Sequence, residues 1–203
     1  MPSERILECA RELFWKQGTK SITMDEIART MGISKKTIYR YYTDKDQIVR
    51  EMASQLFQTQ GKVLDDLTKN SKNAVDEIIS IMKHMGDLFC KINPILFYDL
   101  QKFHPDTWKV FREFKETYAL GMIERNLKRG MTEGLYREDI NVKILARLRM
   151  HEVEMAMDPD LFPADKFNLL EVHFQLIGHF LHGVATLKGH KLINKYKKFQ
   201  EAE

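Results

Sequence analysis

The sequence is poor in cysteine and contains no long apolar run. Its 203 residues include two cysteines, Cys9 and Cys90. Each lies in a helical pattern, so we expect free thiols in a reducing cytosol and neither a disulfide nor a redox switch. No stretch approaches the roughly 18 apolar residues that span a membrane. The charged N-terminus does not resemble a signal peptide. We therefore expect a cytoplasmic protein without a membrane partner.

The motifs of common cofactor and metal enzymes are also missing. The sequence has no phosphate-binding loop, no G-x-G-x-x-G, no H-E-x-x-H and no C-x-x-C. Among the seven scattered histidines, only His179 and His182 are three residues apart. They could bind a metal or lie at a dimer interface, but no cysteine or carboxylate at matching positions supports a metal site. We expect no enzymatic activity, no cofactor and no metal.

The positive charge is concentrated near the N-terminus. Residues 1–50 hold ten Lys/Arg and seven Asp/Glu, a balance of +3 that equals the net charge of the whole chain. The remainder is neutral by this count. A basic excess confined to one segment is typical of a nucleic-acid-binding region.

Residues 23–45 predict two short helices joined by a tight turn. Thr23 and Glu26 form a capping-box pattern at the start of the first helix. Gly32 follows where a helix C-terminus favours a positive φ. Ser34 is a second N-cap, and it precedes a helix predicted over residues 35–42. A further cap, Thr43 with Asp46, is expected to open the next helix.

The second short helix has an apolar edge and a cationic outer face. Ile38 shares its edge with Tyr41 and Tyr42, which we expect to pack on the first helix. A helical hairpin with solvated lysines would show the same composition. The caps, the glycine and the basic face together favour a helix-turn-helix whose second helix enters the DNA major groove. Its outer face carries Lys35, Lys36, Thr37, Tyr39 and Arg40.

Residues 4–50 resemble the DNA-binding domain of the tetracycline-repressor (TetR/AcrR) family. The motifs are Ile6-Leu7-x-x-Ala10, Leu13-Phe14-x-x-x-Gly18, Thr23-x-x-Glu26-Ile27-Ala28, Gly32-Ile33-Ser34-Lys35 and Thr37-Ile38-Tyr39-Arg40-Tyr41-Tyr42-x-x-Lys45. Tyr42, usually Phe in the family, and Asp25, where some members carry a DNA-contacting Arg, depart from the pattern. We expect Lys35, Lys36 and Lys45 to neutralise phosphates, and Thr37, Tyr39 and Arg40 to reach base edges or groove walls. The DNA-binding candidates are Thr23, Ser34, Lys35, Lys36, Thr37, Tyr39, Arg40, Tyr41 and Lys45.

The whole chain is predicted to be all-α, with two domains. Residues 1–47 are expected to form a three-helix helix-turn-helix DNA-binding domain, and residues 48–203 a larger helical ligand-binding and dimerisation domain. Apolar periodicity and helix-breaking residues predict helices over 4–17, 43–67, 75–92, 94–104, 105–130, 141–157 and from about 165 onward.

Seven aromatic residues lie between Phe97 and Tyr118. They could fill a helical core or line a pocket. The family resemblance implies a small-molecule cavity in the middle of the larger domain, and this implication strengthens the interpretation that the aromatic residues line a pocket. The ligand-binding candidates are Phe89, Phe97, Phe103, Trp108, Phe111, Tyr118, Met122, His151 and Phe174.

The last long helix is apolar on two faces, so it could pack on its own domain and on a second subunit. The resemblance implies a homodimer built from the last two long helices of each subunit. The interface candidates are Phe167, Leu170, Phe174, Ile177, Gly178, Leu181 and Val184. The basic segment 188–198 is interpreted as a solvated terminal helix in preference to a second nucleic-acid site.

These features predict a dimeric, sequence-specific transcriptional regulator. It should bind double-stranded DNA at a palindromic operator and act as a repressor relieved by a small apolar or aromatic effector. The alternative is a helical small-molecule-binding protein without a role in DNA regulation, which would account for the aromatic residues but not for the cationic helix.

Overall fold

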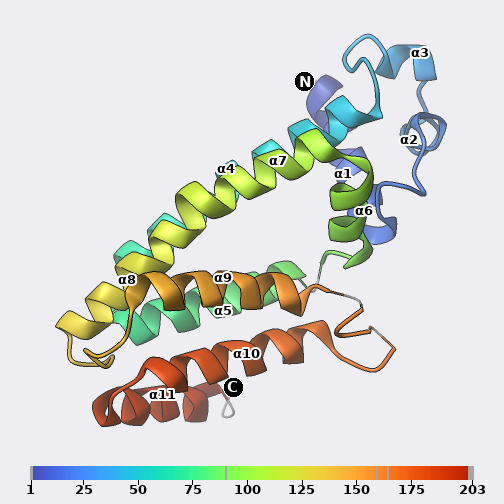
Figure 1. Ribbon diagram of the computed structural model, residues 1–203. Helices are drawn as coiled ribbons and strands as arrows, with labels where there is room; N and C mark the ends of the chain where they lie inside the picture. The colour runs from blue at the N-terminus through green and yellow to red at the C-terminus, as the bar shows by residue number, and fades with distance from the viewer. Residues whose placement is uncertain (1, 90, 159, 164, 201–203) are drawn as a thin grey trace. The chain divides into compact units, whose positions relative to one another are not determined.

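The computed structural model describes residues 2–89, 91–158, 160–163 and 165–200, so Cys90 lies outside the described residues. Within these ranges the regular elements are helices, with one isolated bridge between Tyr136 and Ala185. In chain order (Figure 1) they are α1 (Pro2–Gln17), α2 (Met24–Met31), α3 (Lys35–Ile38), α4 (Lys45–Asn70), α5 (Ala74–Phe89), α6 (Ile95–Phe103), α7 (Pro105–Phe114), the π-helix η1 (Lys115–Ala119), α8 (Leu120–Thr132), α9 (Val142–Ala156), α10 (Leu169–Val184) and α11 (Leu187–Gln200). The predicted all-α class is confirmed.

The chain divides into two compact units. The first contains Met1–Lys62 and Leu88–Phe114. Its core joins buried side chains of α1, α2, α3 and the start of α4 to three from the α6 region, Ile92, Leu96 and Leu100. The helices of the predicted DNA-binding domain therefore share one core with α6. The functional boundary after residue 47 stays a prediction.

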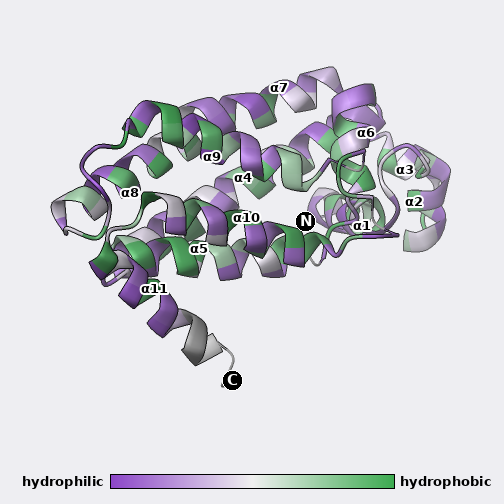
Figure 2. Ribbon diagram, turned by 60° about the horizontal axis from the view of Figure 1, so that its bottom comes forward, coloured by the Kyte–Doolittle hydropathy of each residue, from purple (hydrophilic) through white to green (hydrophobic). Residues whose placement is uncertain are grey.

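The second unit contains Val63–Asp87 and Lys115–Glu203. Here α9 packs against α8 and α10, and α11 packs against α10. The core draws on α5, α8, α9, α10 and α11. Figure 2 shows hydrophilic and hydrophobic residues interleaved along most helices, as expected where each helix buries one face.

Several element boundaries differ from the sequence prediction. The helix expected over 105–130 is interrupted by η1, and the last long helix begins at Leu169, after an Asn168 N-cap, instead of near 165. The basic C-terminal segment is helical but not wholly solvated, because Ile193 is 1% exposed and belongs to the core of the second unit.

The cap of α4 was also predicted wrongly. The Asp44 carboxylate accepts a hydrogen bond from the Gln47 backbone N–H at 2.7 Å, so Asp44 occupies the capping position expected for Thr43. The Gln47 side chain reciprocates by accepting from the Thr43 N–H at 2.7 Å. The arrangement resembles a capping box, except that Gln47 bonds the residue before the cap and not the cap itself.

Candidate nucleic-acid interface

The helix-turn-helix is built from two capped helices and one left-handed glycine. Thr23 accepts a hydrogen bond from the Glu26 N–H at 3.2 Å, and Ser34 accepts one from the Thr37 N–H at 3.1 Å. Gly32 has φ +66°, and its N–H donates to the carbonyls that end α2. A left-handed residue at this point reverses the chain within one turn. The three local signals recognised in the sequence therefore lie where they were predicted.

The short helix α3 buries one edge and exposes the other. Ile38 is fully buried and Tyr42 is 2% exposed, in the same core as Ala28 of α2. Tyr41 is 42% exposed, so the expectation that it packs on the first helix was wrong. The α-helix ends at Ile38, four residues earlier than predicted, and a hydrogen-bonded turn from Tyr39 to Tyr42 continues it.

The outward face of α3 carries the predicted DNA contacts. Lys36, Tyr39 and Arg40 are exposed, Tyr39 to 47%. Thr37 is half-buried, and its hydroxyl lies 2.8 Å from that of Ser34. The face therefore offers two cations and a phenol to a partner. Contact with DNA by any one of these residues stays a prediction.

Lys35 is exposed but paired within the motif. Its Nζ lies 2.7 Å from Oδ2 of Asp25 on α2. The hydrogen bond to this carboxylate raises the pKa of Lys35. Asp25, which the sequence analysis did not assign to DNA, thus partly neutralises the cationic face.

Lys45 is partly buried, and its ammonium group is bound by backbone carbonyls of the first unit. Its Nζ donates to the backbone carbonyls of Thr19 at 2.9 Å and Ile22 at 3.0 Å. Both carbonyls belong to the loop between α1 and α2. The ammonium group that was predicted to contact phosphate therefore stabilises the loop between α1 and α2 in this structure.

The ligand-binding candidates of the first unit form part of an aromatic cluster. Trp108 and Phe97 have ring centroids 4.8 and 6.4 Å from that of Phe111. Phe57 and Phe114, which the sequence analysis did not select, extend the cluster at 5.7 Å from Phe111 and 5.2 Å from Phe57, respectively. The two further candidates of this unit differ, since Phe89 is buried whereas Phe103 is 38% exposed.

The candidates of the second unit are less uniform. The Tyr118 hydroxyl donates to Asp65 at 2.8 Å, and burial with this bond raises the pKa of Tyr118. Met122 is buried. His151 is exposed and lies 3.1 Å from Glu154. Phe174 is 39% exposed. The pocket prediction remains untested for all nine residues.

A buried cluster of charged and titratable side chains in the second unit was not among the ligand-binding candidates. Arg149 and Glu152 on α9 form an ion pair at 3.1 Å with side chains 7% and 8% exposed. His173 on α10 is 2% exposed, and burial together with the Arg149 charge lowers its pKa to about 4. Burial likewise lowers the pKa of Arg149. Perturbed groups of this kind concentrate at functional sites, and the i, i+3 spacing on α9 was the available signal.

The predicted dimer residues on α10 divide into two sets. Ile177, Leu181 and Val184 are at most 3% exposed and belong to the core of their own unit. Phe167 lies before α10 and is 46% exposed; Gly178 and Leu170 are half-buried. Phe174 and Leu170 face α5, because a Cβ added to Gly86 would lie 3.4 and 2.7 Å from them. A single chain leaves the interface prediction untested.

A second exposed apolar surface lies on α9. Ile144, Leu148 and Met155 are 63%, 49% and 41% exposed. Their offsets of four and seven residues place them on one face of the helix. We call this set the α9 stripe. The resemblance implies that the last two long helices build the dimer, but the interface residues predicted from the sequence all lie on or just before the last one, so the α9 stripe was not among them.

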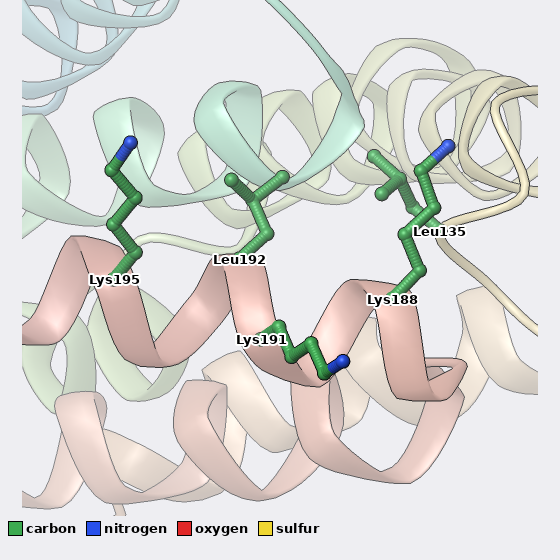
Figure 3. A pocket seen from close by; sticks show the side chains of 5 residues that line it. All are labelled: Leu135, Lys188, Lys191, Leu192 and Lys195. Carbon is green, nitrogen blue, oxygen red and sulfur yellow. The ribbon is translucent and has the colours of Figure 1, made fainter.

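An open groove of about 440 Å³ lies along α11, lined by Leu135, Lys188, Lys191, Leu192 and Lys195 (Figure 3). None of the ligand-binding candidates lines it. Lys188 is tied down by a 2.8 Å hydrogen bond from Nζ to the Glu133 carbonyl. On the same helix His190 lies beside His182, with their Nδ1 atoms 2.8 Å apart. Among the described residues, no three His, Cys, Asp or Glu side chains are grouped as metal ligands.

Two capped helices, a left-handed glycine turn and a cationic outer face define a helix-turn-helix DNA-binding protein. Residues 6–52 match the family model described as bacterial regulatory proteins, tetR family. This match assigns residues 6–52 to the DNA-binding domain of that family, and the chain is a DNA-binding transcriptional regulator. No helix of the described residues is long and apolar enough to cross a membrane.

The chain is also similar to known regulators over most of its length. It is 25% identical over 173 residues to the uncharacterised HTH-type regulator YvaF of Bacillus subtilis, covering 84% of this chain and 90% of YvaF. Its fold matches a transcriptional regulator of Saccharomonospora viridis in complex with choline (TM-score 0.76, 15% identity, 91% and 98% coverage). It also matches FadR of Bacillus subtilis in complex with stearoyl-CoA (TM-score 0.68, 14% identity, 89% and 98% coverage). At these identities the two structures establish the fold alone.

Proposed function

We propose that the protein acts as a homodimeric repressor that binds a palindromic operator and releases it when a small apolar or aromatic molecule binds. The observation that carries the DNA half of this proposal is the outward face of α3. It presents Lys36, Tyr39 and Arg40 on a helix anchored by Ile38. Lysine contacts to phosphate supply sequence-independent affinity, and Tyr39 and Arg40 supply groups for base edges or groove walls.

The dimer is supported by the α9 stripe. Exposed apolar side chains at helical spacing are costly in water and are typical of protein interfaces. In a two-fold dimer, each of the two copies of α3 can bind one half-site. The half-sites are then about 34–36 Å apart, which is one turn of DNA. We therefore assign the principal dimer contact to α9, with the exposed residues of α10 beside it.

The effector is proposed to bind within the helical body. Each unit offers groups of its own for such a ligand: the first has partly buried aromatic residues, and the second has the buried Arg149, Glu152 and His173. Choline and stearoyl-CoA, bound by the two fold relatives, differ widely in size and charge. The fold therefore accommodates unrelated ligands, and the ligand class follows from pocket residues.

The first test is binding of the purified protein to DNA from around its own gene at two salt concentrations, with random DNA as control. Selective binding by a dimer, weakening steeply with salt, is expected because phosphate contacts release counterions. The same assay then screens small molecules for release. Absence of binding to any DNA at low salt, with tight binding of an apolar ligand, would favour the alternative of a ligand-binding protein without DNA regulation.

A further inference from the structure

A buried histidine joins three separated segments of the first unit. His104 lies between α6 and α7 and is 5% exposed. Its Nδ1 lies 2.7 Å from Oδ1 of Asp46, in the first turn of α4. Its Nε2 lies 2.9 Å from the hydroxyl of Thr19, in the loop between α1 and α2. One imidazole thus bonds on both sides to the region predicted to carry the DNA-binding helices.

Asp99 on α6 holds the same loop. Its side chain is 2% exposed, and Oδ2 accepts from the Lys20 backbone N–H at 2.8 Å and from the Thr19 hydroxyl at 3.4 Å. Gly18 permits this approach, since it has φ +76° and an added Cβ would lie 2.6 Å from Asp99 Oδ2. A side chain at residue 18 would therefore displace the carboxylate as well as strain the backbone.

Two more residues, Asn93 and Lys45, bind the end of α1 and the loop through two hydrogen bonds each. Asn93, just before α6, donates from its backbone N–H to the Trp15 carbonyl at 2.7 Å and from Nδ2 to the Lys16 carbonyl at 3.1 Å. Lys45 on α4 holds the carbonyls of Thr19 and Ile22. Asn93 thus binds two carbonyls at the C-terminal end of α1, which would otherwise be left to water, and Lys45 binds two carbonyls of the loop that follows.

The loop 18–22 sets the direction in which α2 leaves α1. Thr23, the N-cap of α2, follows the loop directly, and the Gly32 turn joins α2 to α3. Ile27 of α2 and Ile38 of α3 belong to the same hydrophobic core. A shift of the loop would therefore rotate both helices together. Base readout depends on the angle of the recognition helix, whereas attraction to phosphate depends much less on it.

We propose that His104 is a positioning residue for sequence-specific DNA binding: through Thr19 and Asp46 it fixes the loop that aims the helix-turn-helix. This inference rests on the DNA-binding function and adds a determinant that touches no DNA. It also makes α6 part of the recognition machinery, although α6 lies outside the predicted DNA-binding domain of residues 1–47.

The test uses the full-length protein and three substitutions at one position. A glutamine amide nitrogen can replace Nε2, so His104→Gln keeps the Thr19 bond; an asparagine amide can replace Nδ1, so His104→Asn keeps only the Asp46 bond. His104→Ala keeps neither. Gln101→Ala, an exposed residue of α6, is the control. The wild type first selects its preferred duplex from a random pool. Affinities for this duplex and for random DNA are then measured at one salt concentration, at a temperature where circular dichroism shows each variant folded.

We expect His104→Ala to lower affinity for the selected duplex about tenfold while random-DNA affinity changes by less than about twofold. His104→Gln should recover most of the loss, and His104→Asn little of it. Thr19→Val replaces the hydroxyl with a methyl group and so removes the His104 bond together with the longer one to Asp99; it should reproduce the loss and provides a second variant if His104→Ala does not fold.

Equal losses on both DNAs, or no loss on either, would overturn the positioning role and leave His104 as a stabilising residue. A wild-type protein that selects no sequence would overturn the proposal together with sequence-specific binding itself. That failure is distinguishable, because it appears in the selection before any variant is compared.

Discussion

The outward faces of α3 and α9 are both exposed, but they differ in chemistry. The α3 face carries lysine, arginine and tyrosine side chains, whereas the α9 stripe carries Ile144, Leu148 and Met155, at 63%, 49% and 41% exposure. Water solvates the first face readily. It solvates the second at a cost that grows with the apolar area exposed.

The difference indicates two kinds of partner. A cationic face suits a polyanion whose binding is strong at low salt and reversible at high salt. An apolar stripe suits a partner that stays bound, and a second copy of the chain can supply an identical stripe across a two-fold axis. A regulator needs both, because the permanent interface sets the spacing at which the reversible one reads DNA.

Leu148→Asp is expected to have the largest effect. An aspartate in the middle of the α9 stripe would bury an unpaired charge in the dimer, so the protein should sediment as a monomer. Loss of the second half-site contact should lower operator affinity by more than about 100-fold. Sedimentation and DNA-binding measurements check the two consequences.

The matched control for this change is Leu187→Asp. Leu187 is 83% exposed on α11, outside the α9 stripe, so the same substitution should leave the dimer intact. If Leu148→Asp remains dimeric, the α9 stripe has another partner, and its assignment as the dimer contact is wrong.

Lys45→Ala and Lys36→Ala should separate a structural cation from a DNA-facing one. Lys45→Ala removes two hydrogen bonds from a charged donor and should lower the free energy of unfolding by about 1.5–3 kcal/mol, with the salt dependence of DNA binding unchanged. Lys36→Ala should leave stability unchanged and reduce the slope of log affinity against log salt by about 1. Urea unfolding and salt titrations measure both. A reduced slope for Lys45→Ala would restore it as a phosphate contact.

Local signals in the sequence predicted the helix-turn-helix well. The caps at Thr23 and Ser34 and the left-handed Gly32 each depend on atoms within a few residues, and all three lie where they were expected. The apolar edge of α3 was predicted correctly for Ile38 and Tyr42 but wrongly for Tyr41, which is 42% exposed. That error came from extending a regular helix through the turn that follows Ile38.

Contacts between distant segments could not be predicted in the same way. Lys45 bonds a carbonyl 26 residues earlier, and His104 bonds Thr19, 85 residues away. On α10, apolar spacing led to Ile177 and Leu181 being predicted as dimer-interface residues, whereas both are buried in the core of their own unit. The pattern could not distinguish their own core from a partner, because both are apolar. Only exposed fractions separate these residues from the α9 stripe.

Tyr39→Ala should have an intermediate effect and tests the α3 face directly. Tyr39 is 47% exposed at the end of α3, so its removal costs little packing. We expect operator affinity to fall about tenfold, within the range of a lost base or groove contact, while the melting temperature is unchanged. Tyr41→Ala, also at an exposed tyrosine of the turn, is the matched comparison. Unchanged affinity for Tyr39→Ala would move the recognition surface away from this residue.

Asp25→Asn should have the smallest effect, and in the opposite direction. The Asp25 carboxylate lies 2.7 Å from Lys35 Nζ, with both side chains exposed. Exposed pairs of this kind contribute little to stability, so the fold should not change. Releasing Lys35 and removing one negative charge should raise affinity for operator and random DNA alike, by about two- to threefold at low salt, because phosphate attraction carries no sequence information. Asp66→Asn, the same charge change in the second unit, is the control. An increase in affinity for operator DNA alone would show that Asp25 weakens base readout and does not act by reducing the positive charge of the α3 face.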